Sequence, residues 1–238
     1  MRSENRLLFL SSLLLLVTGQ VAAQQPGDLV TEIELGAILT SGNTEERNVA
    51  YGVTVDWVRN GWEYQVTSDG LRNSRNGTTT AQRFYHVARS RRDMSATSYF
   101  VVRGAYEDDR FNGYDYQTDI TASYGRSWLN NIDNMSLDTD IGPGYRVSES
   151  DEANLSELIM RVAGEYEWGV SETANFYQNV ALEYGQDSNI YRTETGVESE
   201  VMENISLRFS INIRYQTEVP DDRKKTDTQT AVTLVWTF

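Results

Sequence analysis

Acidic and basic side chains recur at alternate positions in several segments of this 238-residue chain, where they share a face with other polar residues. When carboxylates and guanidinium groups are enclosed together, they can either close the interior or form a passage. In contact they cross-link an interior and close it, and on separate walls they give a passage with ion selectivity. The sequence leaves both outcomes open. The residues that we expect to line such an interior are Arg103, Asp119, Asp138, Asp140, Arg161, Glu165, Arg208 and Arg214.

Catalytic and metal chemistry have few candidate residues. A serine hydrolase needs a Ser–His pair with an orienting partner, but His86 is the only histidine and no Gly-x-Ser-x-Gly elbow occurs. The acid pairs Asp108-Asp109 and Asp221-Asp222 could offer oxygen ligands to Ca²⁺, but neither follows a recognised loop pattern. We expect a protein that is not an enzyme, with no catalytic, cofactor-binding or metal-binding residues and no cofactor.

The elements that would position the charged residues are β-strands with one apolar and one polar face. The clearest is 204–217, where an apolar residue stands at every second position from Ile205 to Tyr215. Such alternation predicts a half-buried strand, and its length suits a tilted strand of about 9–11 residues that crosses a membrane. We predict twelve strands, at 30–40, 46–58, 62–72, 79–90, 96–107, 114–128, 134–147, 155–168, 174–186, 190–201, 204–217 and 227–238. In 79–90 the pattern does not decide whether Tyr85 or His86 faces outward.

The last strand carries the strongest signal for location. Leu234, Trp236 and Phe238 share one face, and the chain ends on the aromatic residue. This C-terminal signature is typical of the closing strand of an outer-membrane barrel, whose lipid-facing row is apolar with aromatics at the interface. We expect the barrel-assembly machinery to bind this strand.

The spacing of the strands supports an all-β, antiparallel transmembrane outer-membrane β-barrel. Short connections alternate with longer polar ones, and an even number of strands places both termini on the periplasmic side. The five tryptophans fall near the expected periplasmic ends, where they would form an interfacial ring: Trp57, Trp62, Trp128, Trp168 and Trp236. A soluble barrel with tryptophans in its core is the alternative.

The N-terminus predicts export. Arg2 and Arg6 precede an apolar run from Leu7 to Val17, and small residues end at Ala23, so residues 1–23 resemble a secretory signal peptide. An uncleaved anchor is the alternative, although the run is shorter than the roughly 20 residues of a spanning helix. Residues 24–29 would be a short lead, and 30–238 the barrel domain of the mature protein in the Gram-negative outer membrane.

Composition limits the partners. A net charge of −14 argues against nucleic acid, because phosphate binding needs a basic surface. The absence of cysteine excludes disulfides and thiolate metal sites. We expect a monomer in contact with outer-membrane lipid and lipopolysaccharide.

Two segments resemble the YdiY-like family, described as salt-induced outer-membrane proteins and as a domain of unknown function. The first includes Gly42 and Asn43 after the first strand, and the second is Gly142-Pro143-Gly144-Tyr145-Arg146. The resemblance implies an outer-membrane barrel of the salt-induced type. We expect a narrow porin or a component of envelope stress adaptation. The alternatives are a non-conducting structural barrel whose loops bind a partner or lipopolysaccharide and, less favoured, a barrel hydrolase that uses His86.

Overall fold

Twelve antiparallel strands form a closed barrel in which each strand pairs with its sequence neighbours and β1 pairs with β12. This computed structural model describes residues 29–40, 46–109, 114–129, 132–149, 154–219 and 224–238. The strands are β1 (Leu29–Thr40), β2 (Glu46–Arg59), β3 (Trp62–Arg75), β4 (Thr78–Ser95), β5 (Ser98–Asp109), β6 (Tyr114–Ser127), β7 (Met135–Glu149), β8 (Asn154–Gly169), β9 (Ala174–Gly185), β10 (Ile190–Met202), β11 (Ile205–Gln216) and β12 (Thr226–Thr237). The predicted fold class and strand number are confirmed.

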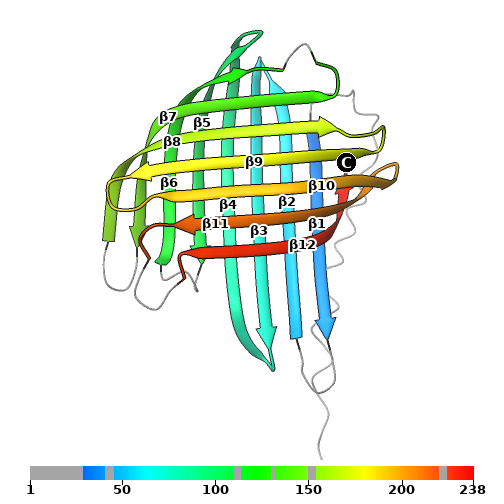
Figure 1. Ribbon diagram of the computed structural model, residues 1–238, viewed down its shortest axis with the longest axis vertical. Coiled ribbons are helices and arrows are strands. Elements are labelled where there is room, and N and C mark those ends of the chain that lie inside the picture. Colours follow the sequence, from blue (N-terminus) through cyan, green and yellow to red (C-terminus); the bar gives the residue numbers. More distant parts are fainter. Residues whose placement is uncertain (1–28, 41–45, 110–113, 130–131, 150–153, 220–223) are drawn as a thin grey trace, which may run out of the picture.

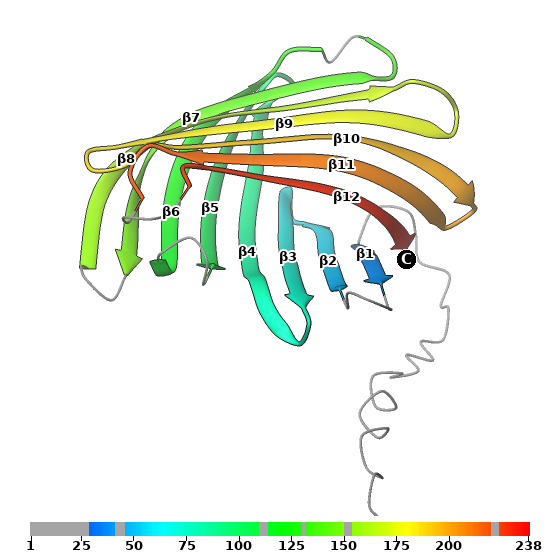
Figure 2. The ribbon, with the colours of Figure 1, turned by 60° about the horizontal axis from the view of Figure 1, so that its bottom comes forward.

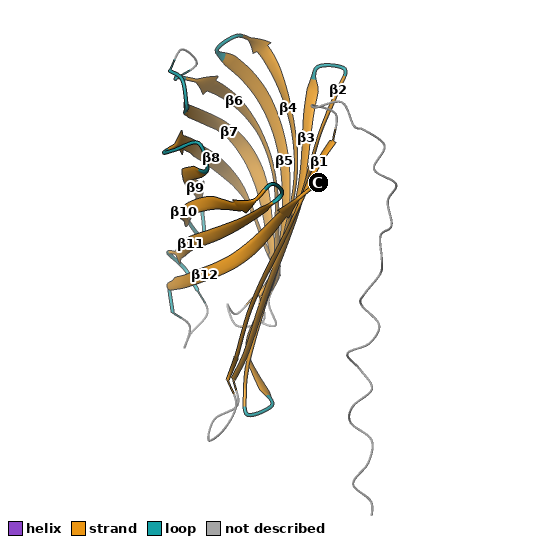
Figure 3. Ribbon diagram, turned by 90° about the vertical axis from the view of Figure 1, so that its right-hand side faces the viewer, coloured by secondary structure: helices purple, strands orange, loops and turns teal. Residues whose placement is uncertain are grey.

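The barrel has two walls whose strands cross in projection. β1 to β5 form one wall, and β8 to β12 run across them in the other (Figure 1). Figures 2 and 3 show that the walls curve toward each other and meet where the C-terminal end of β12 lies beside β1. We call the end of the barrel that holds Leu29 and Phe238 the terminal end, and the opposite end the loop end. The part of the chain that the structure describes has no helix long and apolar enough to cross a membrane.

The expected signal segment 1–23 and residues 24–28 of the lead lie outside the described residues. The same is true of the family motif residues Gly42 and Asn43 and of the acid pair Asp221-Asp222.

Apolar side chains point outward and polar ones inward along β11. Leu207 and Phe209 are each 45 % exposed, whereas Ser210 is 4 % and Gln216 0 % exposed. In β12 the outer row includes Leu234, and Phe238, directly after the strand, is 63 % exposed. This is the arrangement that a barrel in hydrocarbon requires, because its outer face must be apolar.

Aromatic residues gather at two heights on the barrel. All five tryptophans lie in or beside the terminal-end turns or the final strand end, and Trp57 stacks on Tyr64 at 5.1 Å between ring centroids. Nearer the loop end, the Tyr191 ring lies 6.0 Å from that of Tyr184 and 5.7 Å from that of Tyr215. Aromatic girdles at both interfaces with an apolar band between them are typical of outer-membrane barrels.

Two hairpins turn on Asn-Gly pairs. Asn60 and Gly61 have φ values of 55° and 74°, and Asn76 and Gly77 have values of 48° and 79°. These left-handed conformations suit the two-residue turns that Asn-Gly favours. The predicted strands 62–72 and 79–90 leave a loop at 73–78, and this expectation is wrong, because β3 continues to Arg75 and only Asn76 and Gly77 connect it to β4.

The predicted end of the fourth strand at residue 90, with a short connection around Arg91-Arg92-Asp93, is also wrong, because β4 continues to Ser95. Each of the two arginines has a partner on another strand. Arg91 is paired with Asp138 of β7, and the Arg92 guanidinium lies 5.4 Å from the Trp62 ring centroid.

The second family motif brings β6 and β7 unusually close together. A Cβ atom on Gly142 would lie 2.0 Å from the carbonyl oxygen of Ala122 and 2.5 Å from the Cα of Ser123. A Cβ atom on Gly144 would lie 2.6 Å from the carbonyl oxygen of Ile120. These glycines therefore permit strand contact, which gives this part of the motif a structural role.

The Gly142→Ala variant should lower the free energy of unfolding by about 1–3 kcal/mol, the usual cost of forcing extra atoms into a packed site. The measurement is urea unfolding in lipid vesicles, followed by tryptophan fluorescence. Gly104→Ala is the control, because the nearest atom to a Cβ there lies 3.9 Å away. Equal midpoints for the two variants would contradict the close approach of β6 to β7.

Candidate functional site

The most deeply buried ion pairs of the described interior surround Arg146 of β7 at the loop end. Its guanidinium lies 3.3 Å from the Glu157 carboxylate of β8 and 2.7 Å from that of Glu183 of β9. It also donates to the carbonyl oxygen of Ser188 at 3.1 Å. Arg146 and Glu183 are each 1 % exposed. Burial of these charges is tolerable because they are paired and hydrogen-bonded.

Two further arginines extend this network across the lumen. Arg192 of β10 contacts Glu183 at 3.0 Å and Glu107 of β5, on the opposite wall, at 2.7 Å. Arg214 of β11 donates to Gln117 of β6 at 2.7 Å and lies 3.6 Å from Glu107. We call Arg146, Glu157, Glu183, Arg192, Glu107, Arg214 and Gln117 the loop-end network. It ties β10 and β11 to β5 and β6 through the interior.

The terminal half has its own ion pairs, which are less buried. Arg208 of β11 faces Glu32, Glu34 and Glu198 at 3.3, 2.8 and 2.6 Å. On the other side of the lumen, Arg89 of β4 contacts Glu165 of β8 at 2.8 Å. The Arg208 side chain remains 18 % exposed, so water screens these charges more than those of the loop-end network.

The structure places all eight expected lining residues on the inner face of the barrel. Besides the contacts above, Arg103 pairs with Asp119 at 2.7 Å and Arg161 with Asp140 at 3.1 Å. Arg103 also donates to the Tyr85 hydroxyl, which places Tyr85 inside. The eight residues do not form one cluster. They divide among the loop-end network, the middle of the barrel and the terminal half.

Sequence reasoning missed part of the interior. Glu107 and Glu157 were not expected to line it, although Glu107 follows the alternation of Arg103. Arg146 was expected only as a family motif residue. Apolar residues also point inward, with Tyr99 1 %, Val101 3 % and Val235 0 % exposed. Tyr99, Val101 and Arg103 occupy alternate positions of one strand, and this pattern could have predicted an inner face with both apolar and charged residues.

His86 is exposed on the outer face of β4, and its ring stacks on that of Tyr106 at 6.3 Å between centroids. Among the described residues, no hydrogen bond joins its imidazole to a serine hydroxyl. The placement of Tyr85 inside and His86 outside resolves the strand face that the sequence left open.

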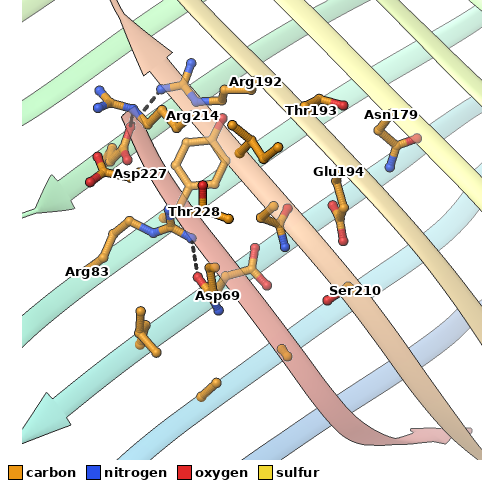
Figure 4. A pocket seen from close by; sticks show the side chains of 18 of the residues that line it. Asp69, Arg83, Asn179, Arg192, Thr193, Glu194, Ser210, Arg214, Asp227 and Thr228 are labelled. Atoms are coloured by element: carbon orange, nitrogen blue, oxygen red, sulfur yellow. Dashed lines mark hydrogen bonds and ion pairs between the residues drawn. The ribbon is translucent and has the colours of Figure 1, made fainter. Parts of the chain in front are cut away.

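Two adjoining cavities occupy the part of the lumen that the ion pairs leave empty. One, of about 480 Å³, extends toward the loop end and is bordered by Arg83, Arg192, Arg214 and Asp227. Figure 4 shows Arg192 and Arg214 together at one side of this cavity, with Asp69 and Glu194 at a distance from them. The other, of about 910 Å³, opens toward the terminal end. Four residues line both cavities, so the two are contiguous: Glu34, Asp69, Asn179 and Glu194.

The 910 Å³ cavity is strongly acidic. Its described lining includes seven carboxylates and one guanidinium, that of Arg208: the acids are Glu32, Glu34, Asp56, Asp69, Glu167, Glu194 and Glu198. Carboxylates on low-dielectric walls concentrate cations and repel anions. The arrangement can therefore attract small cations into the terminal half of the lumen.

Comparisons with known proteins agree with the fold. The model of the family described as "Protein of unknown function, DUF481" matches residues 33–238. The uncharacterized protein YdiY of Escherichia coli (strain K12) is 24 % identical over 204 residues, which cover 85 % of this chain and 80 % of YdiY.

Two solved structures share the architecture at low identity. An outer membrane channel from Pseudomonas putida F1 has a TM-score of 0.53 at 10 % identity, covering 91 % of this chain and 97 % of the channel. The translocator domain of the autotransporter NalP from Neisseria meningitidis has a TM-score of 0.51 at 12 % identity, covering 91 % and 90 %. These similarities support an outer-membrane type of barrel and carry no information on the solute.

The Arg146→Met variant should lower the free energy of unfolding by about 3–5 kcal/mol, because two buried carboxylates lose their shared partner. Arg208→Met is the control. It removes an arginine that faces the wider acidic cavity, where water can solvate the carboxylates that remain, so its loss should be smaller. Urea unfolding of both variants in vesicles measures the difference. Equal losses would show that the loop-end network is no more important to stability than the partly hydrated pairs.

Proposed function

This chain belongs to the DUF481 family, and we propose that it is an outer-membrane channel for small cationic solutes, narrowed at its loop end by ion pairs. The observation that carries this proposal is the contiguous pair of cavities with an acidic excess in their lining. The two aromatic belts and the apolar outer face support a position in the outer membrane. The N-terminal sequence supports export with cleavage of a signal peptide.

The channel would have a wide and a narrow part. Solutes would enter or leave the 910 Å³ cavity at the terminal end, which faces the periplasm if the topology follows that of other outer-membrane barrels. The narrow part lies where Arg192 and Arg214 reach Glu107 across the lumen. Twelve strands enclose less space than the sixteen of a general porin, which agrees with a restricted passage.

The test of this proposal is single-channel recording with the purified, refolded protein in planar bilayers. Under a KCl gradient, the reversal potential of the wild type should indicate a preference for K⁺ over Cl⁻. The Asp69→Asn, Glu194→Gln variant should shift the reversal potential toward zero, because both carboxylates border both cavities. Glu203→Gln, in the β10–β11 turn, is the control and should leave it unchanged. An absence of channel events over a range of voltages and salt concentrations would refute conduction.

A non-conducting structural barrel is the second candidate, and the loop-end network favours it. In that case the contacts from β10 and β11 to β5 and β6 serve only to hold the barrel closed. The outer loops would then carry the function by binding a partner or lipopolysaccharide.

The Arg192→Ala variant separates the two candidates. It removes the 2.7 Å contact with Glu107 that crosses the lumen. A channel should then show larger single-channel conductance than the wild type, while Arg91→Ala, near the terminal end, should not. A structural barrel should lose stability in both variants and conduct in neither.

The association with salt stress is a separate proposal, which follows from the family resemblance. A strain that lacks the protein should grow more slowly than its parent at high external salt, and the wild-type gene should restore growth. Restoration by the Asp69→Asn, Glu194→Gln variant would argue that the cation path is irrelevant to this role.

A further inference from the structure

The pairing of β1 with β12 covers only part of their length. Its register runs from Glu32↔Thr237 to Leu35↔Leu234, and Thr31 and Phe238 exchange two backbone hydrogen bonds of 3.0 and 2.9 Å. Both strands nevertheless continue toward the loop end. β1 remains paired with β2 as far as Thr40, and β12 with β11 from Thr226 onward. Within the described residues, the loop-end half of the β1–β12 seam is therefore unpaired.

The direction of each backbone group along this edge follows from the Thr31–Phe238 pair. In an antiparallel ladder, alternate residues of a strand point their N–H and C=O groups to the same neighbour. Counting back from Phe238, Val232 and Thr230 point toward β1 beyond the paired part. Thr228 follows in the same alternation, past the end of β1 at Thr40. Unpaired amides in hydrocarbon cost several kcal/mol each, so this edge needs water or another polar partner.

The outer face of β12 is polar at the same place. Thr226, Thr228 and Thr230 are exposed there, and Thr228 also borders the 480 Å³ cavity. Their cross-strand partners on β11 are Tyr215, Ile213 and Ile211, which belong to the apolar outer row. A polar notch thus interrupts the apolar band beside the unpaired edge, so water can reach the edge from outside.

The 480 Å³ cavity lies directly behind this notch. Gln229 and Ala231 of β12 line it from one side of the seam, and Ala50 and Tyr51 of β2 line it from the other. Arg83 of β4 donates to the Gln229 amide oxygen at 3.1 Å and so connects β12 to the opposite wall. Figure 4 shows β12 crossing the strands that carry Asp69 and Arg83.

The charge of the cavity indicates which ligand fits. Its described lining has seven carboxylates and four guanidinium groups. Among the described residues, no basic side chain forms an ion pair with Asp69, Glu194 or Asp227. A cationic group in the cavity would therefore be attracted, while an apolar chain attached to it could remain in the membrane.

We propose that the loop-end half of the β1–β12 seam is a lateral mouth of the lumen, which admits the cationic head of a single-chain membrane amphiphile into the 480 Å³ cavity. This inference extends the proposed channel for cationic solutes. The seam can be tested without any measurement of conduction, so the two proposals can fail separately.

The first test is hydrogen–deuterium exchange of assigned backbone amides, with the full barrel in lipid nanodiscs. Amides of Val232, Thr230 and Thr228 should exchange about 100-fold or more faster than those of Thr233, Ala231 and Gln229, which point toward β11. The second set is the control, because its residues alternate with the first set along the same strand and lie at the same depth in the membrane. Equal protection of both sets would overturn the lateral mouth, whatever the conductance of the protein.

The second test uses dodecyltrimethylammonium as the probe. It should shift the amide resonances of Thr228 and Thr230 saturably, whereas uncharged dodecyl maltoside should not. Ala231→Phe, at the mouth, should weaken this binding tenfold or more. Ala181→Phe adds the same bulk to the same cavity on β9, away from the seam, and should weaken it less than threefold.

Each remaining result would overturn the proposal in a defined way. Equal shifts with the uncharged detergent would show that the notch binds alkyl chains without regard to charge. Equal weakening by the two phenylalanine variants would place the entry elsewhere. Protection of Val232, Thr230 and Thr228 that rises with protein concentration would assign the edge to a second copy of the chain.

Discussion

Hydrocarbon offers no partner to a backbone amide, and the architecture of this protein follows from that constraint. A membrane-spanning strand must pair on both sides, so the sheet closes on itself, and its side chains divide into a lipid-facing and an inner row. Leu207 and Phe209 outside, with Ser210 and Gln216 inside, are the direct consequence. The paired part of the β1–β12 seam obeys the same rule. Leu234 is the last residue of β12 in that register, and beyond Val232 the outer row of β12 changes to threonine at Thr230 and Thr228.

The charged interior follows from the same division of faces. Once polar residues are forced inward, their charges must find partners or water. On one side of the lumen they find partners, and the loop-end network around Arg146 and Glu183 is almost fully buried. On the other side the charged side chains border the two contiguous cavities. The barrel is thus cross-linked and hollow at once, which is why the sequence alone could not choose between the two uses of its charges.

The parts of the fold that depend on local pattern were predictable. Strand number, the outer face of β11 and the interfacial tryptophans follow from alternation and from the preference of indole for a half-wet site. Features that depend on distant partners were not. The continuation of β4 through Arg91 and Arg92 could not be predicted, because their partners, Asp138 and Trp62, lie on other strands. The face of Tyr85 was open for the same reason, since it is fixed by Arg103 of β5.

The candidate site shows the same limit. The inward position of Arg208 or Arg214 could be predicted from the alternation of one strand, but the partners of each could not. A free Arg214 would attract an anion, but its contacts with Gln117 and Glu107 hold its guanidinium against the wall. Carboxylates without an arginine partner among the described residues, such as Asp69 and Glu194, border the cavities instead. In the channel that we propose, selectivity would therefore depend less on how many charges point inward than on which of them have no ion-pair partner.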